Sequence, residues 1–393
     1  MKALVCRNAQ FAVDDRPDPV PGPGQVRIKV LRCGICGGDV SARKGLDTWA
    51  DMAARVGYHR FGRANEPIVF GHEFSGEVMD YGPGCRRRTP SGKHVVALPL
   101  LRGSEGVDTL GYSLHAPGAY AEQMLVSEPL MMPVPNGLAP EVAAMTEPLT
   151  VSWHAVRRGE VDKGAVAFVI GCGPIGLGVI LMLKARGVKM VVASDYSPGR
   201  RAKATACGAD VVVDPSQGSL FTAVDRKSHL KDIPAALNLA VGALEKLGRL
   251  PVGWWHAWRL AETLGAAPKP PVIFECVGAP GLLQSVIETA PLFSRVVVVG
   301  FTMGADQFMP AMAIRKEIDL RFVGAYTPLE FRDMLHMLAN GKVDPRPMLT
   351  ATVGLEGVDA AFAALGDPEV HAKILIDPSA LGSGLATVGP LPA

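Results

Sequence analysis

The sequence lacks a long uninterrupted apolar run, and it has few cysteines for its length. Its seven cysteines are an odd number spread over 393 residues, which argues against a disulfide framework and for reduced thiols. The opening "MKALVCRNAQ" turns polar at Arg7, Asn8 and Gln10, so it does not match an export signal. Residues 164–183 carry no charge, but they contain five glycines and Pro174 and so predict a strand, a turn and a helix rather than a membrane span. These absences favour a cytoplasmic protein without a membrane partner.

Charge of one sign is not concentrated anywhere in the chain. The net charge is +2, with 40 basic and 38 acidic residues. The short run at Arg86, Arg87 and Arg88 is typical of a solvated turn. We therefore expect no nucleic-acid partner. With 48% hydrophobic and 20% charged residues, the chain has enough apolar material for one or two full-sized cores.

Three zones differ in their hydrophobic pattern. Residues 1–149 alternate in short segments such as "QVRIKVLRCG", broken by turns such as "PDPVPGPG", which predicts turn-rich β structure resembling a small barrel. Residues 150–326 alternate apolar strands with helical segments and predict a parallel sheet. Residues 327–393 return to a helix and a closing strand. We therefore predict an α/β protein whose second zone is a domain of its own.

One segment interrupts the strand and helix alternation of the second zone. Residues 221–271 have their own helical spacing and a tryptophan cluster, "GWWHAW". They are too apolar for a free linker, so we expect a helical subdomain. Packing on the surrounding domain and packing on a neighbouring subunit both remain open.

The second zone contains a glycine motif where a strand ends and a helix begins. Gly171, Gly173 and Gly176 form G-x-G-x-x-G, with Pro174 and Ile175 between the last two. The first glycine permits a tight turn, the second leaves room for a pyrophosphate, and the third lets the helix pack closely on the strand. The helix N-terminus then faces the anion. We expect this turn to bind a dinucleotide.

The choice of dinucleotide depends on the end of the next strand. Asp195 lies 22 residues after Gly173, near the roughly 20 expected for an acid that accepts the ribose hydroxyls. A carboxylate there repels a 2′-phosphate and favours NAD over NADP. Arg200 and Arg201 follow closely and soften that preference.

The stretch 31–45, "LRCGICGGDVSARKG", places Cys33 and Cys36 in a C-x-x-C. A structural zinc clip needs a second cysteine pair, but the remaining cysteines are isolated. A redox pair belongs at the start of a helix after a strand, whereas Gly37 and Gly38 follow Cys36 at once. Two buried thiols and one corner of a metal site both remain open.

Two further segments contain metal-ligand residue types. His72 and Glu73 follow a glycine in "FGHEFSGEV", and Glu147 precedes Pro148 in "MTEPLTVSWHA". A catalytic zinc has three protein ligands and one open position. Cys36, His72 and Glu147 would supply one sulfur, one nitrogen and one oxygen donor. Each residue alone also fits an ordinary core or surface role.

Five motifs in sequence order resemble the zinc-dependent medium-chain alcohol dehydrogenases. They are "CGICGGD", "GHEFSGEV", "EPLTVSWHAV", "GCGPIGLG" and a tail that begins "LANGKVDPRPMLT". Within the family the chain is most similar to the branch of sorbitol and threonine dehydrogenases, except over residues 46–64 and 221–271. The resemblance implies a GroES-like β-barrel catalytic domain at 1–149 and 327–393. It also implies a Rossmann domain with a doubly wound parallel sheet at 150–326, NAD, one catalytic zinc, and a homo-dimer or homo-tetramer.

The resemblance also implies roles for single residues. Cys36, His72 and Glu147 correspond to the zinc ligands, and Glu73 to an acid that either binds the metal or lies behind it. Because adjacent residues on a strand point in opposite directions, we rank Glu73 below the other three. Asp39 corresponds to a carboxylate that orients a ligand. The implied reaction is hydride transfer between a secondary alcohol or polyol, or the ketone, and NAD.

Three features depart from the family pattern. The segment "HVVALPLLRGSEGVDTLGYSLHAPGAY" has no cysteine where many members bind a structural zinc, so we expect the catalytic zinc alone. The chain after Cys36 is longer than usual and either lines the substrate cleft or is a surface elaboration. Gly38 replaces a Ser or Thr whose hydroxyl relays a proton. We expect either a water chain, assisted by Ser41 or Glu73, or room for a bulkier substrate.

Two other classes of function stay open. A zinc-independent enone or quinone reductase of the same superfamily would share the glycine motif but lack the set of Cys36, His72 and Glu147. A non-catalytic binding protein on the same scaffold would be consistent with the missing hydroxyl at Gly38. The sequence indicates a small alcohol or ketone as substrate and does not name it.

Overall fold

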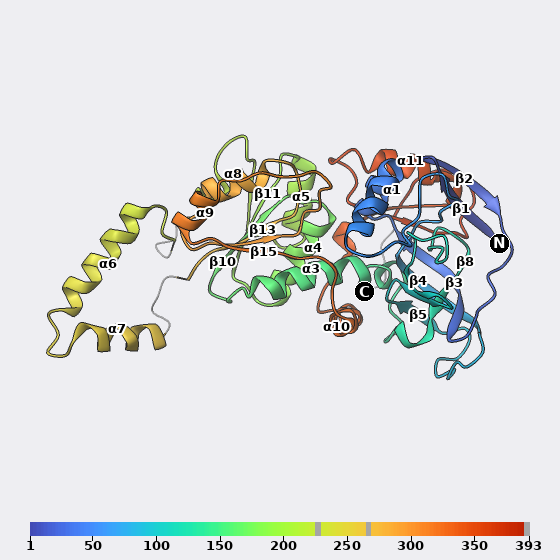
Figure 1. The fold of residues 1–393 in the computed structure, drawn as a ribbon, viewed down its shortest axis with the longest axis horizontal. Helices are drawn as coiled ribbons and strands as arrows, with labels where there is room; N and C mark the ends of the chain where they lie inside the picture. The colour runs from blue at the N-terminus through green and yellow to red at the C-terminus, as the bar shows by residue number, and fades with distance from the viewer. Residues whose placement is uncertain (225–228, 265–268, 389–393) are drawn as a thin grey trace. The chain divides into compact units, whose positions relative to one another are not determined.

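The structure is a computed structural model that describes residues 1–224, 229–264 and 269–388 (Figure 1). The chain separates into two compact units. Unit 1 consists of Met1–His154, Gly173–Met182 and Ala325–Ala393, and unit 2 of Ala155–Cys172 and Leu183–Gly324. Unit 1 is therefore assembled from three separate segments of the chain.

The main sheet of unit 1 joins strands from both ends of the sequence. Its order is β18-β16-β17-β3-β4-β5-β9, and β8 pairs with β3 as well. In the long central strand β3, Val26, Ile28 and Val30 are buried at alternate positions, as expected for a strand with one face on a core. The strands are β3 (Gln25–Gly34), β4 (Glu73–Tyr81), β5 (His94–Ala97), β8 (Gln123–Ser127), β9 (Met131–Pro133), β16 (Leu349–Val353), β17 (Lys373–Ile376) and β18 (Ala386–Thr387).

Smaller elements complete unit 1. Two hairpins pair β1 (Lys2–Arg7) with β2 (Gln10–Asp15) and β6 (Leu100–Gly103) with β7 (Gly106–Thr109). The helices are α1 (Gly37–Arg55), α2 (Pro140–Ala143), α10 (Pro328–Ala339) and α11 (Val358–Ala364), with short turns η1 (Glu128–Leu130), η3 (Arg346–Met348) and η4 (Leu355–Gly357). The 19-residue helix α1 lies in a zone for which the sequence predicts turn-rich β structure.

Unit 2 contains a six-stranded parallel sheet in the order β12-β11-β10-β13-β14-β15. Counted along the chain, this order is 3-2-1-4-5-6, which is that of doubly wound dinucleotide-binding sheets. The strands are β10 (Val166–Ile170), β11 (Met190–Ser194), β12 (Val211–Val213), β13 (Val272–Glu275), β14 (Arg295–Val298) and β15 (Asp319–Phe322). The predicted parallel sheet is confirmed.

Helices connect these strands, and two of them contribute residues to both units. The two are α3 (Thr146–Gly159) and α4 (Pro174–Ala185). The others in unit 2 are α5 (Pro198–Ala206), η2 (Leu220–Thr222), α6 (Ile233–Leu247), α7 (Trp254–Thr263), α8 (Leu282–Thr289) and α9 (Pro310–Lys316). Among the described helices, none is both long enough and apolar enough to cross a bilayer.

The interrupting segment 221–271 lies in the connection between β12 and β13. Its start packs on the sheet, because the ring of Phe221 lies 5.1 Å from that of Phe168. Its helices α6 and α7 contact each other, and neither contains a buried residue. Packing of these helices on the surrounding domain is therefore the wrong expectation. Residues 225–228 and 265–268 of the segment lie outside the described residues.

Candidate metal centre and dinucleotide-binding turn

Cys36 lies between the end of β3 and the start of α1. It caps the N-terminus of α1, where its Sγ accepts a hydrogen bond from the Gly38 amide at 3.3 Å. The Asp39 side chain accepts in return from the Cys36 amide at 3.4 Å, which completes a capping box. The expected exclusion of a strand-to-helix position by the two glycines is therefore wrong, because this reciprocal cap starts a helix directly at Gly37.

The surroundings of the two thiols still oppose a redox pair. Cys33 is fully buried, and burial together with the carboxylates of Asp39 and Glu73 raises its pKa well above the usual 9.0. Burial and the Glu73 carboxylate also raise the pKa of Cys36. Catalytic redox cysteines need a lowered pKa, so the environment of this pair fits a packed thiol beside a metal ligand better.

Three metal-ligand residue types meet in unit 1. Cys36, His72 and Glu73 each offer one ligand atom, and these atoms lie within 4.8 Å of one another. Strand alternation does not separate His72 from Glu73, contrary to expectation, because β4 begins only at Glu73. Gly71, with φ of 103°, makes the turn before His72, and a Cβ there would lie 2.9 Å from Cys33 Sγ.

Asp39 lies beside the His72 ring and orients it. It is fully buried, and its Oδ1 lies 3.4 Å from His72 Nδ1, which has no hydrogen-bond partner of good geometry in the described part of the chain. Burial alone would lower the pKa of His72, but Asp39 and Cys36 outweigh it and raise that pKa well above 6.5. The hydroxyls of Tyr112 and Tyr120 each donate to Asp39 at 2.8 Å. The predicted orienting role of Asp39 agrees with this geometry.

Glu73 carries a partner that sequence analysis missed. Lys373 Nζ donates to Glu73 Oε1 at 2.9 Å, to Oε2 at 2.6 Å and to the Ile35 carbonyl at 3.0 Å. Both charged side chains are buried. A Cβ on Gly34 would overlap the Glu73 carboxylate, so this glycine permits the close approach. The signal in the sequence was a single lysine inside the apolar closing strand "AKILID".

Glu147 lies outside the group formed by Cys36, His72 and Glu73 but close to it. It sits in the first turn of α3, and the hydroxyl of Tyr326 donates to its Oε1 at 2.9 Å. Burial, opposed by the charge of His72 and reinforced by Glu73, raises the pKa of Glu147 to about 7. Its hydrogen-bond partner is neutral, whereas Glu73 has a lysine. Of the two buried acids, Glu147 is therefore the one whose negative charge has no cation at hydrogen-bond distance among the described residues.

The donor set fits a zinc ion. A thiol, an imidazole and carboxylates are the groups that zinc binds, and Asp39 fixes the imidazole as metal sites require. Ser41, by contrast, is exposed, and its hydroxyl donates to the Gly38 carbonyl within its own helix. The space over Gly38 is also filled, because a Cβ there would lie 3.0 Å from the Tyr112 hydroxyl. Room for a bulkier substrate at Gly38 is thus the wrong expectation.

The glycine turn has the backbone conformation that its motif predicts. It follows β10, and Gly171 adopts φ of 88°, where a Cβ would lie 2.5 Å from Val277. At Gly173 an added Cβ would meet nothing within 4 Å, so this position is open for an incoming group. Pro174 is the first residue of α4, and Ile175 and Gly176 continue its first turn.

Asp195 follows β11, and its side chain hydrogen-bonds the glycine turn. Its Oδ2 accepts from the Cys172 amide at 2.8 Å and its Oδ1 from the Ser197 amide at 2.9 Å. Arg200 Nη1 lies 3.8 Å from Asp195, and Arg201 donates to the Asp195 carbonyl. The acid thus stands beside the glycine turn with two guanidinium groups close behind it.

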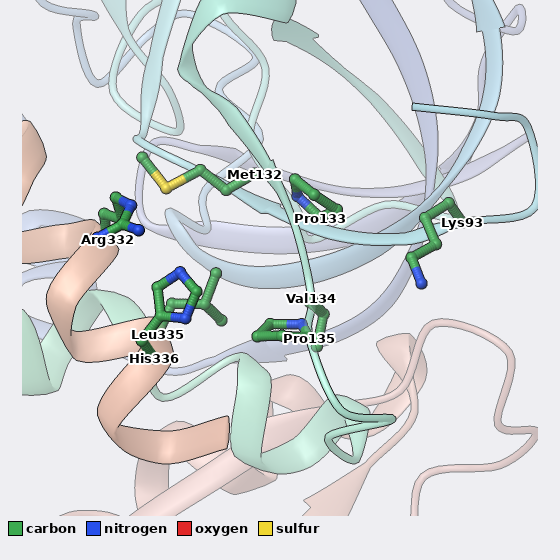
Figure 2. A pocket seen from close by; sticks show the side chains of 8 residues that line it. All are labelled: Lys93, Met132, Pro133, Val134, Pro135, Arg332, Leu335 and His336. Atoms are coloured by element: carbon green, nitrogen blue, oxygen red, sulfur yellow. The ribbon is translucent and has the colours of Figure 1, made fainter. Parts of the chain in front are cut away.

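A separate pocket of about 510 Å³ lies in unit 1. Figure 2 shows Lys93 and Arg332 at opposite sides of it. Between them the lining includes Met132, Val134 and Leu335. The pocket contains none of the candidate ligands.

Comparison with known proteins identifies the family of the chain. The family model of the alcohol dehydrogenase GroES-like domain matches residues 22–136, and that of the zinc-binding dehydrogenase matches residues 174–340. L-threonine 3-dehydrogenase of Rhizobium etli is 32% identical over 379 residues, which cover 93% of this chain and 95% of that protein. (R,R)-butanediol dehydrogenase of Bacillus subtilis is 28% identical over 389 residues, which cover 96% of this chain and 100% of that protein.

Solved structures agree as well. The crystal structure of 2R,3R-butanediol dehydrogenase from Bacillus subtilis matches with a TM-score of 0.71 at 27% identity, covering 96% of this chain and 99% of that one. The expected combination of a GroES-like domain with a doubly wound parallel sheet is confirmed. The chain therefore belongs to the zinc-dependent medium-chain alcohol dehydrogenases.

Proposed function

We propose that the chain is a zinc-containing, NAD-dependent dehydrogenase that transfers hydride between a secondary alcohol or polyol and its ketone. The strongest support for this function is that ligand atoms of Cys36, His72 and Glu73 lie within 4.8 Å of one another. The chain also belongs to a zinc-dependent dehydrogenase family. A zinc-independent enone or quinone reductase has no use for such a set. The family relation supports an alcohol and its carbonyl compound as the substrate pair.

We assign the zinc ligands to Cys36, His72 and Glu147. The charge of Glu73 is already paired with Lys373, whereas the hydrogen-bond partner of Glu147 among the described residues is the neutral Tyr326. A buried acid without a cationic partner gains most from a nearby cation. Glu73 then stays behind the metal site, as the second of the two roles that the resemblance allows.

The chain's own groups prepare this site for chemistry. Zinc, when bound, supplies a positive charge that lowers the pKa of an alcohol hydroxyl. Asp39 holds the His72 ring through its Nδ1 side, which leaves the other ring nitrogen for the metal. The N-terminus of α1 stabilises negative charge on Cys36 Sγ, which accepts from the Gly38 amide. These contacts fix two ligands before metal arrives.

The cofactor is proposed to be NAD, bound at the glycine turn. The open space at Gly173 and the N-terminus of α4 suit a pyrophosphate. The carboxylate of Asp195 beside that turn favours a free ribose hydroxyl over a 2′-phosphate. We also propose a cytoplasmic homo-oligomer, one zinc per chain and no structural zinc.

One combined experiment tests the proposal. The purified protein is analysed for metal and assayed for NAD reduction with 2,3-butanediol, sorbitol, threonine and simple secondary alcohols. We expect about one zinc per chain and activity on at least one alcohol, with the reverse reaction on the ketone. Reduction of enones or quinones without zinc would support the reductase class instead. Zinc and NAD binding without any turnover would support a binding protein.

A further inference from the structure

The space above Gly38 is occupied by a group from a distant part of the chain. A Cβ built on Gly38 would lie 3.0 Å from the hydroxyl oxygen of Tyr112 and 3.4 Å from Cys36 Sγ. The phenol oxygen and the proposed zinc ligand therefore flank the same point. A Ser or Thr at position 38 would place a hydroxyl at this point. In this chain Tyr112 places one there instead.

Tyr112 is held in this position by its ring and by its hydroxyl. The hydroxyl donates to Asp39 Oδ1 at 2.8 Å. The ring packs in a cluster with two other aromatic rings, with centroids 6.0 Å from Trp49 and 5.2 Å from Phe61, which lie 6.1 Å from each other. It also lies 5.2 Å from the His72 ring. Trp49 and Phe61 belong to the segment 46–64 that the family resemblance does not cover. That segment thus forms the wall that fixes Tyr112 beside the metal ligands.

We propose that the Tyr112 hydroxyl is the polar group that hydrogen-bonds the reacting oxygen of the substrate, in place of a side chain at position 38. The inference rests on the proposed dehydrogenase function. A phenol has one proton to donate and lone pairs to accept, and its hydrogen rotates to suit its partner. While the Tyr112 hydroxyl donates its hydrogen bond to Asp39, its oxygen can accept a hydrogen bond from the hydroxyl of an alcohol. With the proton turned away from Asp39, it donates to the carbonyl oxygen of a ketone.

Two tyrosines allow a matched comparison. Tyr112→Phe and Tyr120→Phe each keep a ring and each remove one hydrogen bond from Asp39. Both therefore weaken the support of His72 to a similar degree, but only Tyr112→Phe removes the hydroxyl over Gly38. We expect Tyr112→Phe to lower kcat/KM for the alcohol about tenfold or more beyond the loss in Tyr120→Phe. Zinc content should be equal in the two variants.

Restoring a hydroxyl from position 38 gives a second readout. In the wild type, Gly38→Ser places its Cβ against the Tyr112 oxygen, so it should reduce activity. In Tyr112→Phe that oxygen is gone, and Gly38→Ser should recover most of the lost kcat/KM. Gly38→Ala in the same background fills the space without a hydroxyl and should recover nothing. If Tyr112 only supports the fold, Gly38→Ser should not lower kcat/KM in the wild type and raise it in Tyr112→Phe.

The outcomes separate this inference from the function on which it rests. Equal losses in Tyr112→Phe and Tyr120→Phe, or equal recovery by Ser and Ala at position 38, would overturn the role of Tyr112 in an active enzyme. If the wild type reduces no NAD with any alcohol, the proposed function fails. In that case the role of Tyr112 is tested by equilibrium binding of the same alcohols to the zinc-loaded wild type and Tyr112→Phe. Equal affinity of the two proteins would overturn the inference.

A second, independent observation concerns helices α6 and α7 (Figure 1). Eleven large hydrophobic side chains between Ile233 and Leu264 have exposed fractions of 39% to 75%. On α6, Ile233, Leu237, Val241 and Leu244 recur at helical spacing and form one apolar stripe. An apolar stripe of this length on a described helix needs a partner surface.

We propose that the α6–α7 hairpin is an interface with the same hairpin in a second copy of the chain. Its exposed apolar side chains offer about 850 Å², taking roughly 150 Å² for each fully exposed large side chain. Stable protein interfaces bury about 800 Å² on each partner. A lipid surface is disfavoured, because the hairpin between Ile233 and Leu264 has three basic residues, Lys246, Arg249 and Arg259, whereas membrane-surface helices carry many. A symmetric pair of hairpins would bury both stripes at once.

The molar mass of the full chain in solution tests this interface. Leu237→Glu with Val241→Glu should halve the mass measured by light scattering, with unchanged helix content. Val370→Glu, at a residue with a similar exposed fraction of 55%, is the control and should leave the mass unchanged. A wild type that is monomeric at tens of micromolar, an unchanged mass of the double variant, or flotation of the protein with anionic liposomes would each overturn the proposal.

Discussion

Lys373 and Glu73 form a buried ion pair, with Nζ 2.6 Å from Oε2, and a Glu73 carboxylate oxygen lies within 4.8 Å of the ligand atoms of Cys36 and His72. Removing the lysine should leave an unpaired carboxylate in the core. We expect Lys373→Met to reduce the free energy of unfolding of the metal-free protein by about 3–5 kcal/mol, measured by urea denaturation. The same variant should bind zinc more tightly, because the freed Glu73 adds negative charge beside Cys36 and His72.

The double variant Lys373→Met with Glu73→Gln is the control for that experiment. It removes both charges, so it should recover most of the lost stability and none of the gain in zinc affinity. Competition with a chromogenic chelator measures the affinity. Weaker zinc binding in Lys373→Met would contradict the view that the lysine neutralises Glu73.

The assignment of zinc ligands predicts a sharp contrast within the C-x-x-C. Cys36→Ser and His72→Ala should lose both bound zinc and dehydrogenase activity, as measured by metal analysis and NAD reduction. Cys33→Ser changes a fully buried thiol that donates to the Gly34 carbonyl at 3.5 Å, and it should keep zinc and most activity. Full zinc content in Cys36→Ser would exclude Cys36 as a ligand.

The cofactor preference should depend on the charge of Asp195. Asp195→Asn keeps an oxygen that can accept from the Cys172 or Ser197 amide but removes the negative charge. We expect the ratio of kcat/KM for NAD to that for NADP to fall about tenfold or more, since Arg200 then faces the 2′-phosphate without the competing carboxylate of Asp195. A wild type that prefers NADP would reverse the assignment and direct attention to Arg200.

The segment 46–64 is held by an ion pair whose strength should depend on pH. Arg60 binds the buried Asp108 with two hydrogen bonds, at 2.7 Å and 2.5 Å. Burial would raise the pKa of Asp108, but hydrogen bonds from Arg60 and Tyr58 outweigh it and lower that pKa below its usual 3.8. Because the folded pKa is lowered, this contribution is present above about pH 3.8 and is lost as the pH falls further.

The variant Arg60→Met tests that dependence. At pH 7 it leaves Asp108 charged and without its guanidinium, so the free energy of unfolding should fall, by less than for the fully buried pair of Lys373 and Glu73 because solvent screens Arg60. Below pH 3.8 the difference from the wild type should shrink, because Asp108 is protonated in the unfolded chain and its lowered folded pKa no longer contributes. A difference that stays constant from pH 7 to pH 3 would contradict the role of this pair.

The sequence predicted the parts of the fold that depend on local pattern. Apolar strands alternating with helices are sufficient to predict the parallel sheet of unit 2, and the glycine turn after β10 follows from the strict demands of its backbone at Gly171. The start of α1 was missed, because two glycines each disfavour a helix by about 1 kcal/mol. The capping box of Cys36 and Asp39 offsets that cost, and such a cap is unusual with a thiol.

The partners of the candidate ligands could not be predicted, because they are distant in sequence. Lys373 is 300 residues from Glu73, and Tyr112 is 73 residues from Asp39. A lysine in a strand and a tyrosine in a loop have many ordinary roles, so neither residue signals a site by itself. Only the folded chain brings the second tyrosine, Tyr120, to the same carboxylate.

The position of the α6–α7 hairpin also has a consequence for the rate of folding. Strands β10 and β13 are neighbours in the sheet, yet Ile170 pairs with Glu275, so roughly 100 residues of chain must be closed into a loop before they meet. Residues 221–271 make up about half of that loop. Because loop-closure entropy grows only with the logarithm of length, the extra chain costs about 0.6 kcal/mol, or roughly a threefold slower closure. An insertion at this crossover therefore leaves the central pairing of the sheet kinetically accessible.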